Sequence, residues 1–455
     1  MVVVNPWRKI LAPAANFFSS IRGSLCVGRF PIEEIVNKVG TPFYVYDATS
    51  MREQYRKLIS AIPENFTIHY SVKANPNFAA MEVFCKTGSG AEVASAAELE
   101  AAIEAGFNPE KIIYAGPGKT QNELLAAVKA GIAVINVESL TELQRLEHVV
   151  AESQLRKPPP AVAFRVNIDK KMKDAGESMA GGSRKFGIDA EEIEPLVAKA
   201  LSSKRLKFVG FHCFAATQAL YHENLTEAYS NYSGWVKDFA RSMNLDISYM
   251  NFGGGFGIPY SDTEKDLDVV SLGKELDHIT KELKTLPNFK NTQFHLEPGR
   301  YLVGPSGIYV SEVLDIKKSR GVSYAITNGG INHALVPISL NKNFPVKLIN
   351  KMNHRDSKPI VLAGPLCSSS DQFSRQVMLP EPELGDLVGI FNSGAYGYSA
   401  SMLAFLSHPT PAEVLVDGNF LYLIRKPKRP AFGGKEILCK TTDEKVQPIK
   451  NSEGK

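Results

Sequence analysis

The feature that most constrains the fold is a repeat in which a short apolar, strand-like stretch ends on polar or glycine residues. Eight such stretches follow one another, and they read HYSVKA, SGAEVAS, KIIYAGPG, AVINVES, AVAFRVN, FVGFHCF, YMNFGGG and FHLEPGR. Eight strand-then-helix units close into a (β/α)8 barrel, in which functional side chains gather at the carboxyl ends of the strands. The sequence therefore predicts an α/β barrel whose strand ends form a single site.

The segments between these stretches carry signals of helix starts and ends. Three S/T-x-x-E sequences fit a capping box directly after a strand, and they begin at Ser95, Thr120 and Ser139. Two of the apolar runs that follow stop at Gly106 and Gly131, the residue type favoured just past a helix end. A doubly wound open sheet also alternates strands and helices, but it seldom needs eight successive parallel units. The barrel is therefore the stronger interpretation.

Length and composition indicate more than one domain. The chain has 455 residues, of which 44% are hydrophobic and 22% charged, so it can bury a large core. After residue 304 the pattern changes to short β-rich runs separated by turns, which predicts an antiparallel β domain of barrel or sandwich type. The expected divisions are an N-terminal tail over 1–23, a β domain from 24–42 and 304–430, the barrel over 43–303, and a C-terminal tail over 431–455.

Cysteine spacing and charge exclude several classes of protein. The five cysteines include no C-x-x-C pair, which argues against a disulfide framework or a metal site and favours a reducing, cytoplasmic compartment. No stretch is long and apolar enough to span a bilayer, and the segment 7–22 is interpreted as a tail or docked helix. The net charge is only +4, so nucleic-acid binding is not implied. The basic cluster Arg425-Lys426-Pro427-Lys428-Arg429 is interpreted as a solvated face.

Lys73 and the last two strand ends are the first candidates for chemistry. At a barrel mouth the Lys73 amine would be partly desolvated, which lowers its pKa and favours a Schiff-base nucleophile. The glycines 253 to 255 would let backbone amides approach an anion such as a phosphate, although a tight turn would also explain them. Glu297, followed closely by Arg300, could pair with a pyridinium nitrogen and so make pyridoxal phosphate an electron sink, with structural ion pairing as the alternative.

Seven motifs in order, spread over roughly residues 40 to 425, indicate one family. They read YSVKANPN, AEVASAAELEAA, IIYAGPGK, FGGGFG, EPGRYLVGPSG, GPLCSSSD and NSGAYGYSASM. Together they resemble the pyridoxal-phosphate decarboxylases of fold type III, which include diaminopimelate, ornithine and arginine decarboxylases. The resemblance implies pyridoxal 5'-phosphate as the cofactor and a homodimer with shared active sites. Related racemases lack the GPLC segment, and related non-catalytic regulators tend to lose the lysine and the cysteine.

The resemblance also implies roles for individual residues. Those at the cofactor would be Lys73, Glu92, His212, Gly253, Gly254, Gly255, Glu297, Arg300 and Tyr396. Lys73 would bind the cofactor covalently, Glu297 would face the pyridine nitrogen, and His212 would stack on the ring. The glycine loop, Arg300 and Tyr396 would hold the phosphate. The second catalytic residue would be Cys367, which would reach the site from the partner subunit and reprotonate the α-carbon, whereas an isolated cysteine is more often a small buried hydrophobe.

Departures from the family pattern bear on the substrate. Ser368 and Asn328 stand where decarboxylases of basic amino acids carry acids that hold a distal ammonium. An ammonium desolvated without a partner is costly, so the expected substrate has no distal positive charge. Asp371, which ends the GPLCSSSD motif, is the third residue expected at the substrate. Ala215 replaces a usual phosphate-binding serine, and Thr217 is the nearest hydroxyl.

Within the group, the sequence resembles most the butirosin-pathway type of decarboxylase, which acts on a glutamyl thioester of an acyl-carrier protein. The shared features are SRKFGID, a displaced T-Q after the histidine, GGGFG-x-PY, and SGAYG followed by FLSHPTPAEVL. The implied substrate is an amino acid or an aminoacyl group on an acyl-carrier protein, and the basic cluster 425–429 would suit an acidic carrier. A diaminopimelate decarboxylase of lysine biosynthesis and a non-catalytic regulator are the alternatives.

Overall fold

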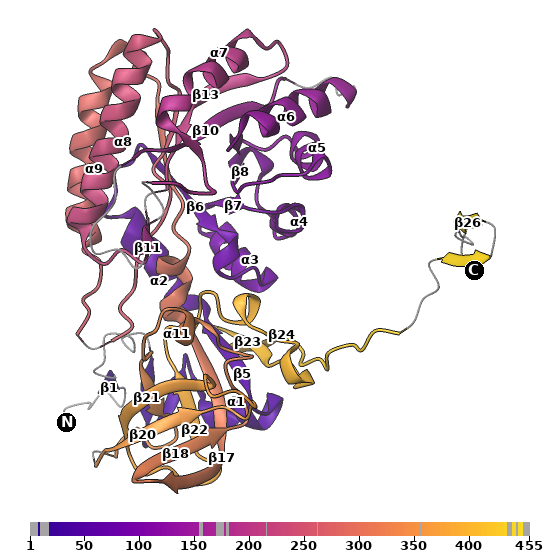
Figure 1. Cartoon of the computed structure of the whole chain (residues 1–455). Coiled ribbons are helices and arrows are strands. Elements are labelled where there is room, and N and C mark those ends of the chain that lie inside the picture. The colour runs from indigo at the N-terminus through magenta and orange to yellow at the C-terminus, as the bar shows by residue number, and fades with distance from the viewer. Residues whose placement is uncertain are drawn as a thin grey trace.

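A computed structural model shows that the chain is built around two large sheets, a closed barrel and a second, open sheet (Figure 1). It describes residues 8–9, 18–153, 158–169, 177–178, 182–214, 216–261, 263–354, 356–434, 439–442 and 445–448. In the view of Figure 1 the barrel lies above the second sheet. Within the described part of the chain, no helix combines the length and apolar character that crossing a membrane requires.

Eight parallel strands form the barrel. Each strand pairs with the next in chain order, and the last pairs with the first, so the ring is closed. The strands are β6 (Phe66–Ser71), β7 (Gly90–Val93), β8 (Ile112–Tyr114), β9 (Val134–Val137), β10 (Ala161–Asn167), β13 (Lys207–His212), β15 (Tyr249–Asn251) and β16 (Gln293–Leu296). They coincide with the eight stretches recognised in the sequence, so the predicted barrel is confirmed.

Helices flank the barrel strands: one directly precedes the first strand, and one follows each of the first seven. They are α2 (Ala48–Ile59), α3 (Phe78–Lys86), α4 (Ala96–Glu104), α5 (Gln121–Ala130), α6 (Leu140–Glu152), α7 (Glu194–Ser202), α8 (His222–Ser242) and α9 (Val269–Lys284). Thr120 forms the complete capping box at α5, and Ser95 and Ser139 accept the expected amide hydrogen bonds at α4 and α6. Gly131 ends α5 in the left-handed conformation, with φ 71°.

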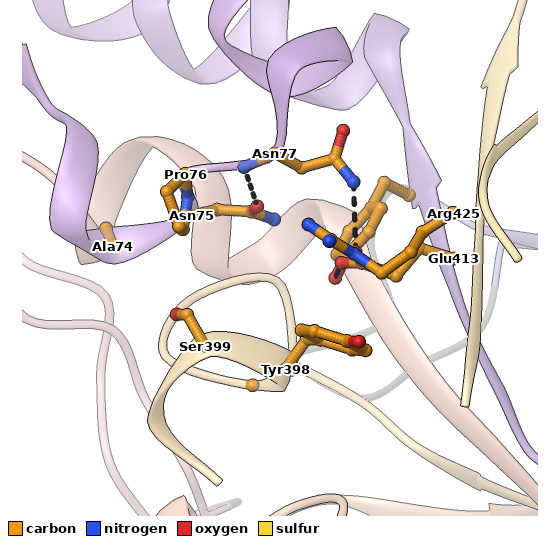
Figure 2. A pocket seen from close by; sticks show the side chains of 10 residues that line it. Ala74, Asn75, Pro76, Asn77, Tyr398, Ser399, Glu413 and Arg425 are labelled. Atoms are coloured by element: carbon orange, nitrogen blue, oxygen red, sulfur yellow. Dashed lines mark hydrogen bonds and ion pairs between the residues drawn. The ribbon is translucent and has the colours of Figure 1, made fainter. Parts of the chain in front are cut away.

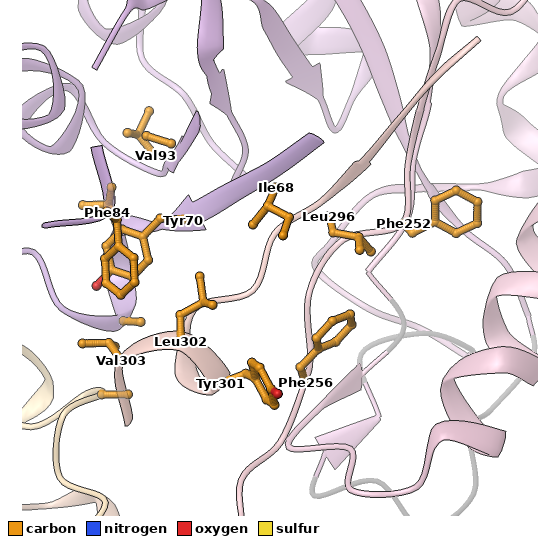
Figure 3. Close-up of a cluster of buried hydrophobic side chains, with 14 of the residues drawn as sticks. Ile68, Tyr70, Phe84, Val93, Phe252, Phe256, Leu296, Tyr301, Leu302 and Val303 are labelled. Atoms are coloured by element: carbon orange, nitrogen blue, oxygen red, sulfur yellow. The ribbon is translucent and has the colours of Figure 1, made fainter. Parts of the chain in front are cut away.

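A cluster of buried apolar side chains packs beneath the carboxyl ends of the first and last barrel strands (Figure 3). Ile68 and Tyr70 of β6 are buried, and the Tyr70 ring stacks on Phe84 of α3 with centroids 4.1 Å apart. Leu296 of β16 and Leu302 of α10 (Arg300–Val303) are also fully buried. Burying each such side chain contributes about 1.5–3 kcal/mol, so the strand end before Lys73 stands on a rigid support.

The second sheet is mixed. Its path is β21-β20-β18-β17-β5-β23-β24, and β22 pairs with both β17 and β19. The strands are β5 (Phe43–Asp47), β17 (Gly307–Ser319), β18 (Val322–Thr327), β19 (Val346–Leu348), β20 (Lys358–Ala363), β21 (Gln372–Leu379), β22 (Leu387–Ile390), β23 (Ala412–Asp417) and β24 (Phe420–Arg425). The separate β domain is confirmed and most of its strand pairs are antiparallel, but β18 with β20 and β5 with β23 run parallel.

The strand β5 lies in this second sheet, although the barrel was expected to begin at residue 43. It pairs with β17 on one side and β23 on the other, and all five of its residues are buried. A strand buried on both faces reads as a continuous apolar run, so its sequence resembles that of a barrel strand. The chain enters the barrel only with α2.

The two end segments contain short strands. β2 (Ser19–Ile21) pairs with β1 (Arg8–Lys9) and with β3 (Ser24–Val27), which pairs with β4 (Phe30–Pro31) before α1 (Ile32–Val39). The described part of 1–23 is therefore strand rather than tail or helix, and the rest of that segment lies outside the described residues. In the C-terminal segment, β25 (Cys439–Thr442) and β26 (Lys445–Pro448) form a hairpin.

Candidate active site

Lys73 lies directly beyond β6, in the single helical turn Val72–Ala74. Its Nζ lies 3.0 Å from Oε1 and 2.9 Å from Oε2 of Glu92, the third of the four residues of the neighbouring strand β7. Ser71 also donates a hydrogen bond to this carboxylate. The Lys73 side chain is 40% exposed, whereas that of Glu92 is 1% exposed. A fixed, buried acid therefore holds an accessible lysine at the barrel mouth.

This pairing determines the charge on Lys73. Burial disfavours the ammonium, but the charge and hydrogen bonds of Glu92, together with the charge of Glu297, outweigh burial and raise the pKa of Lys73. The lowered pKa expected from the sequence is therefore wrong. The expectation considered desolvation alone, whereas an acid on the next strand of a parallel barrel stabilises the charged form.

Glu297 is the second buried acid of the rim and follows β16. It accepts hydrogen bonds from His212 Nε2 at 3.2 Å and from Asn251 Nδ2 at 2.7 Å. Burial by itself would raise the pKa of Glu297, but the charge and hydrogen bond of His212 outweigh burial and hold the pKa below its usual value. The carboxylate is ionised at neutral pH. Within the described residues, His212 Nδ1 is buried without a partner.

The glycine loop follows β15 and lies against the backbone of neighbouring strand ends. A Cβ at Gly253, Gly254 or Gly255 would lie 2.3, 2.2 or 2.2 Å from a backbone carbonyl oxygen, so no side chain fits. Among the described residues, no hydrogen-bond acceptor contacts the amides of Gly254 and Gly255. Two backbone donors are thus available to an anion at this edge of the barrel.

Arg300 starts α10 beside this loop. Its Nη1 donates to the Tyr260 hydroxyl at 2.6 Å, and its guanidinium carbon lies 4.7 Å from the centre of the Tyr396 ring. Tyr396 has φ 56°, which is uncommon for a residue other than glycine, and its amide donates to the carbonyl of Ala74 at 2.7 Å. The backbone next to Lys73 therefore contacts the residue that covers Arg300.

The rim also contains a buried ion pair that was not predicted from the sequence. Arg165 of β10 contacts Glu138 at 3.1 Å, and both side chains are buried. The Arg165 guanidinium carbon lies 5.6 Å from the centre of the Phe214 ring, and Lys73 Nζ lies 5.9 Å from the same point. The available signal was an arginine flanked by apolar residues in AVAFRVN, because an arginine is seldom buried unless it is paired.

Figure 2 shows how the segment after Lys73 is fixed to the second sheet. Glu413 of β23 is buried and accepts hydrogen bonds from Asn77 Nδ2 at 3.0 Å, from the Tyr46 hydroxyl at 2.7 Å and from Arg425. The Arg425 guanidinium also lies 4.4 Å from the centre of the Tyr398 ring. Arg425 is therefore engaged internally and does not belong to the solvated face predicted for 425–429.

Two of the residues expected at the substrate are engaged within the second sheet's own loops. Asn328 donates to Thr41 Oγ1 at 2.7 Å and accepts from the Glu312 amide at 3.1 Å. Asp371 is 3% exposed, and its two oxygens accept the amides of Ile331 and Leu366, each at 2.8 Å. The Asp371 carboxylate thus fixes the loop that carries Cys367.

Cys367 and Ser368 lie in the exposed part of that loop, between β20 and β21. Cys367 is exposed, and the Ser368 hydroxyl bonds the Ser370 hydroxyl at 2.7 Å. Among the described residues of one chain, no hydrogen bond or ion pair joins either of them to Lys73. Ala215 lies outside the described residues, and Thr217 is on the short strand β14 (Ala216–Thr217).

Comparison with known proteins agrees with this geometry. Residues 48–304 match the family described as pyridoxal-dependent decarboxylase, pyridoxal binding domain. The chain belongs to the pyridoxal-dependent decarboxylase family. It is a pyridoxal-phosphate-dependent carboxy-lyase, as the seven motifs predicted. The buried, unpartnered His212 Nδ1, the open glycine amides and the accessible Lys73 fit such a cofactor at this rim.

Three relatives place the decarboxylase within its family. An L-glutamyl-[BtrI acyl-carrier protein] decarboxylase of Niallia circulans is 35% identical, covering 87% of this chain and 93% of the relative. A 2-[(L-alanin-3-ylcarbamoyl)methyl]-2-hydroxybutanedioate decarboxylase of Staphylococcus aureus is 31% identical, covering 84% and 93%. The crystal structure of diaminopimelate decarboxylase from M. jannaschi aligns with TM-score 0.84 at 27% identity, covering 91% and 96%.

Proposed function

We propose that the decarboxylase removes the α-carboxyl group of an amino acid, or of an aminoacyl group on a carrier protein, whose distal end carries no positive charge. The proposal rests on one observation: the three residues expected at the substrate provide no carboxylate that is free to bind an ammonium. Ser368 and Asn328 are neutral, and Asp371 is buried with both oxygens bonded to backbone amides. None of these three residues offers a free carboxylate to a distal ammonium.

The rim residues would hold the cofactor. Bound pyridoxal phosphate supplies an electron sink for the pair left by departing carbon dioxide. Lys73 would bind it, the ionised Glu297 would face its ring nitrogen, and His212 would pack on its ring. The amides of Gly254 and Gly255 with Arg300 would hold its phosphate.

Substrate energetics favour a glutamyl-like group over diaminopimelate. A buried charge left without its partner costs on the order of 3–5 kcal/mol, which corresponds to at least a hundredfold discrimination. The names of the two relatives above describe a glutamyl group on a carrier protein and a compound containing a butanedioate. Both agree with a site that lacks a distal acid, although the similarity to diaminopimelate decarboxylase keeps that substrate as the second candidate.

The proposed active unit is a homodimer. Cys367 is exposed at the surface of the second sheet's loop, where it is accessible to another copy of the chain. In this arrangement Cys367 of the partner subunit would deliver the proton to the α-carbon at the Lys73 rim. A site completed by the partner would also exclude water during the reaction.

The test measures carbon dioxide release from each of five compounds. They are L-glutamyl-carrier protein, L-glutamate, meso-diaminopimelate, L-lysine and L-ornithine. The glutamyl substrates should be turned over, and the three substrates with a distal ammonium should be poor. A double variant, Ser368→Glu with Asn328→Asp, should raise the relative turnover of diaminopimelate at least about tenfold by restoring counter-charges. Efficient turnover of diaminopimelate by the unchanged protein, with the glutamyl substrates inert, would overturn the proposal.

A further inference from the structure

The geometry points to Tyr260 as the residue that positions Arg300 for the cofactor phosphate. This inference rests on the proposed assignment of Arg300 to that phosphate. Tyr260 is 0% exposed and accepts the hydrogen bond from Arg300 Nη1 at 2.6 Å. Its sequence signal was the PY that follows the glycine loop, which the family roles leave without a function.

Arg300 leaves donors for an anion once Tyr260 and Tyr396 have engaged it. Nη1 is held by Tyr260, and one part of the guanidinium lies over the Tyr396 ring. The buried Nε has no partner among the described residues, which is an unfavourable state unless a ligand supplies an acceptor. Fixing a long, flexible side chain in advance also spares the ligand much of the entropy cost of ordering it.

Tyr260 suits this role because it accepts a hydrogen bond without carrying a charge. Burial raises the pKa of its phenol despite the nearby Arg300 charge, so the hydroxyl stays neutral at physiological pH. A carboxylate in the same position would neutralise Arg300 and compete with the phosphate. A neutral acceptor orients the guanidinium and leaves its positive charge for the ligand.

Tyr260 is itself held by both parts of the molecule. Its ring stacks on Phe344 of the second domain, with centroids 3.9 Å apart and planes at 16°. Its amide donates to Glu264 at 2.7 Å, and Lys342 pairs with that same carboxylate. The preceding carbonyl, that of Pro259, accepts from Asn392 Nδ2 at 2.6 Å. These contacts fix the position of the Tyr260 hydroxyl relative to the rim.

The experiment compares pyridoxal phosphate with pyridoxal, which lacks the phosphate. The full chain is freed of cofactor and titrated with each compound while absorbance and circular dichroism are followed. Tyr260→Phe keeps the ring and its stacking but removes the acceptor, so pyridoxal phosphate should bind about tenfold more weakly and pyridoxal unchanged. Phe344→Leu, which loosens the tyrosine, should give a smaller loss of the same kind.

Tyr301→Phe is the matched control, because Tyr301 follows Arg300 and its buried hydroxyl has no partner in the described structure. This variant should bind both compounds as the unchanged protein does. An equal loss for both compounds in Tyr260→Phe, or no loss, would overturn the inference. Arg300→Gln tests the proposed role of Arg300 separately from the positioning role of Tyr260. If this variant still binds pyridoxal phosphate more tightly than pyridoxal by the same factor, Arg300 does not hold the phosphate.

Discussion

Single residues at the rim carry their charges in buried or half-buried pairs. Lys73 pairs with Glu92, and His212 pairs with Glu297. Each pair joins the ends of different strands, so each charge is held in place by the barrel and does not depend on a mobile loop. A site with fixed charges stabilises a charged ligand without reorganising, which is the main electrostatic advantage of an enzyme over water.

Lys73→Ala should abolish cofactor attachment. Without the amine no covalent bond to pyridoxal phosphate forms, so the absorbance band of the attached cofactor should vanish and carbon dioxide release should fall by at least about a hundredfold. Lys86→Ala is a suitable control, because Lys86 is 71% exposed on α3 and pairs with the exposed Glu82. An intact band in Lys73→Ala would show that another lysine binds the cofactor.

Acid should weaken the fold partly through His69, which is buried within β6, two residues before the end of the strand. His69 Nε2 contacts His295 Nδ1 at 2.9 Å, and burial lowers the pKa of His69 from 6.5 to about 4. The folded state therefore favours neutral His69, and the stability it contributes is complete above pH 6.5 and is lost as the pH falls from 6.5 to 4. The shift corresponds to roughly 3 kcal/mol.

Urea unfolding at several pH values measures this loss. In His69→Gln the free energy of unfolding should fall less between pH 6.5 and 4 than in the unchanged protein. Acids such as Glu297 titrate in both proteins, so the difference isolates the histidine. His148→Gln provides the comparison at an exposed position, 55% exposed on α6, and should leave the pH dependence unchanged. Parallel curves for all three proteins would contradict the prediction.

Sequence patterns identified rim residues only where a local signal marked them. Lys73, Glu297 and the glycines could be predicted because each ends a recognisable strand. Tyr260 and Asn251 were not assigned, since their roles depend on Arg300 and Glu297, which are distant in sequence. The pKa of Lys73 was mispredicted for the same reason: the deciding acid lies on the next strand.

At the scale of elements, the hairpin of β23 and β24 supports the segment that carries Lys73. Glu413→Gln should destabilise the protein by on the order of 2–3 kcal/mol, because the buried Glu413 carboxylate accepts hydrogen bonds from Asn77, Tyr46 and Arg425, and a neutral amide cannot replace them all. Asp417→Asn on the same strand breaks the Arg52 pair, whose side chains are 30% and 35% exposed, and should cost less than about 1 kcal/mol. Denaturant unfolding of both variants measures the contrast, and equal losses would refute it.

Elements with a local signal were predictable, and those defined by distant partners were not. The eight barrel strands and the helix starts at Ser95, Thr120 and Ser139 follow from periodicity and capping within a few residues. The position of β5 does not, because its partners β17 and β23 lie far along the chain. The parallel pairing of β18 with β20 was also not predictable, because the relative direction of two strands depends on the segment that joins them and not on the residues of either strand.

The whole molecule should work as a dimer with shared sites. Lys73→Ala and Cys367→Ala should each be inactive alone, but mixing them after subunit exchange should restore about one quarter of the activity. Half of the dimers would be mixed, and each would hold one intact site of two. The measurement is carbon dioxide release, with mass analysis to verify exchange. No recovery in verified mixed dimers would place both residues of a site in one subunit.

The place of β5 also sets the order in which the molecule can be completed during synthesis. As the chain leaves the ribosome, Phe43–Asp47 emerges before residues 48–306, and its partners β17 and β23 emerge only after them. At translation speeds of about 5–20 residues per second, this apolar segment waits unpaired for tens of seconds while the barrel is made. The nascent chain therefore exposes a strand with two open edges for that period, which makes it a natural point of contact for a ribosome-associated chaperone.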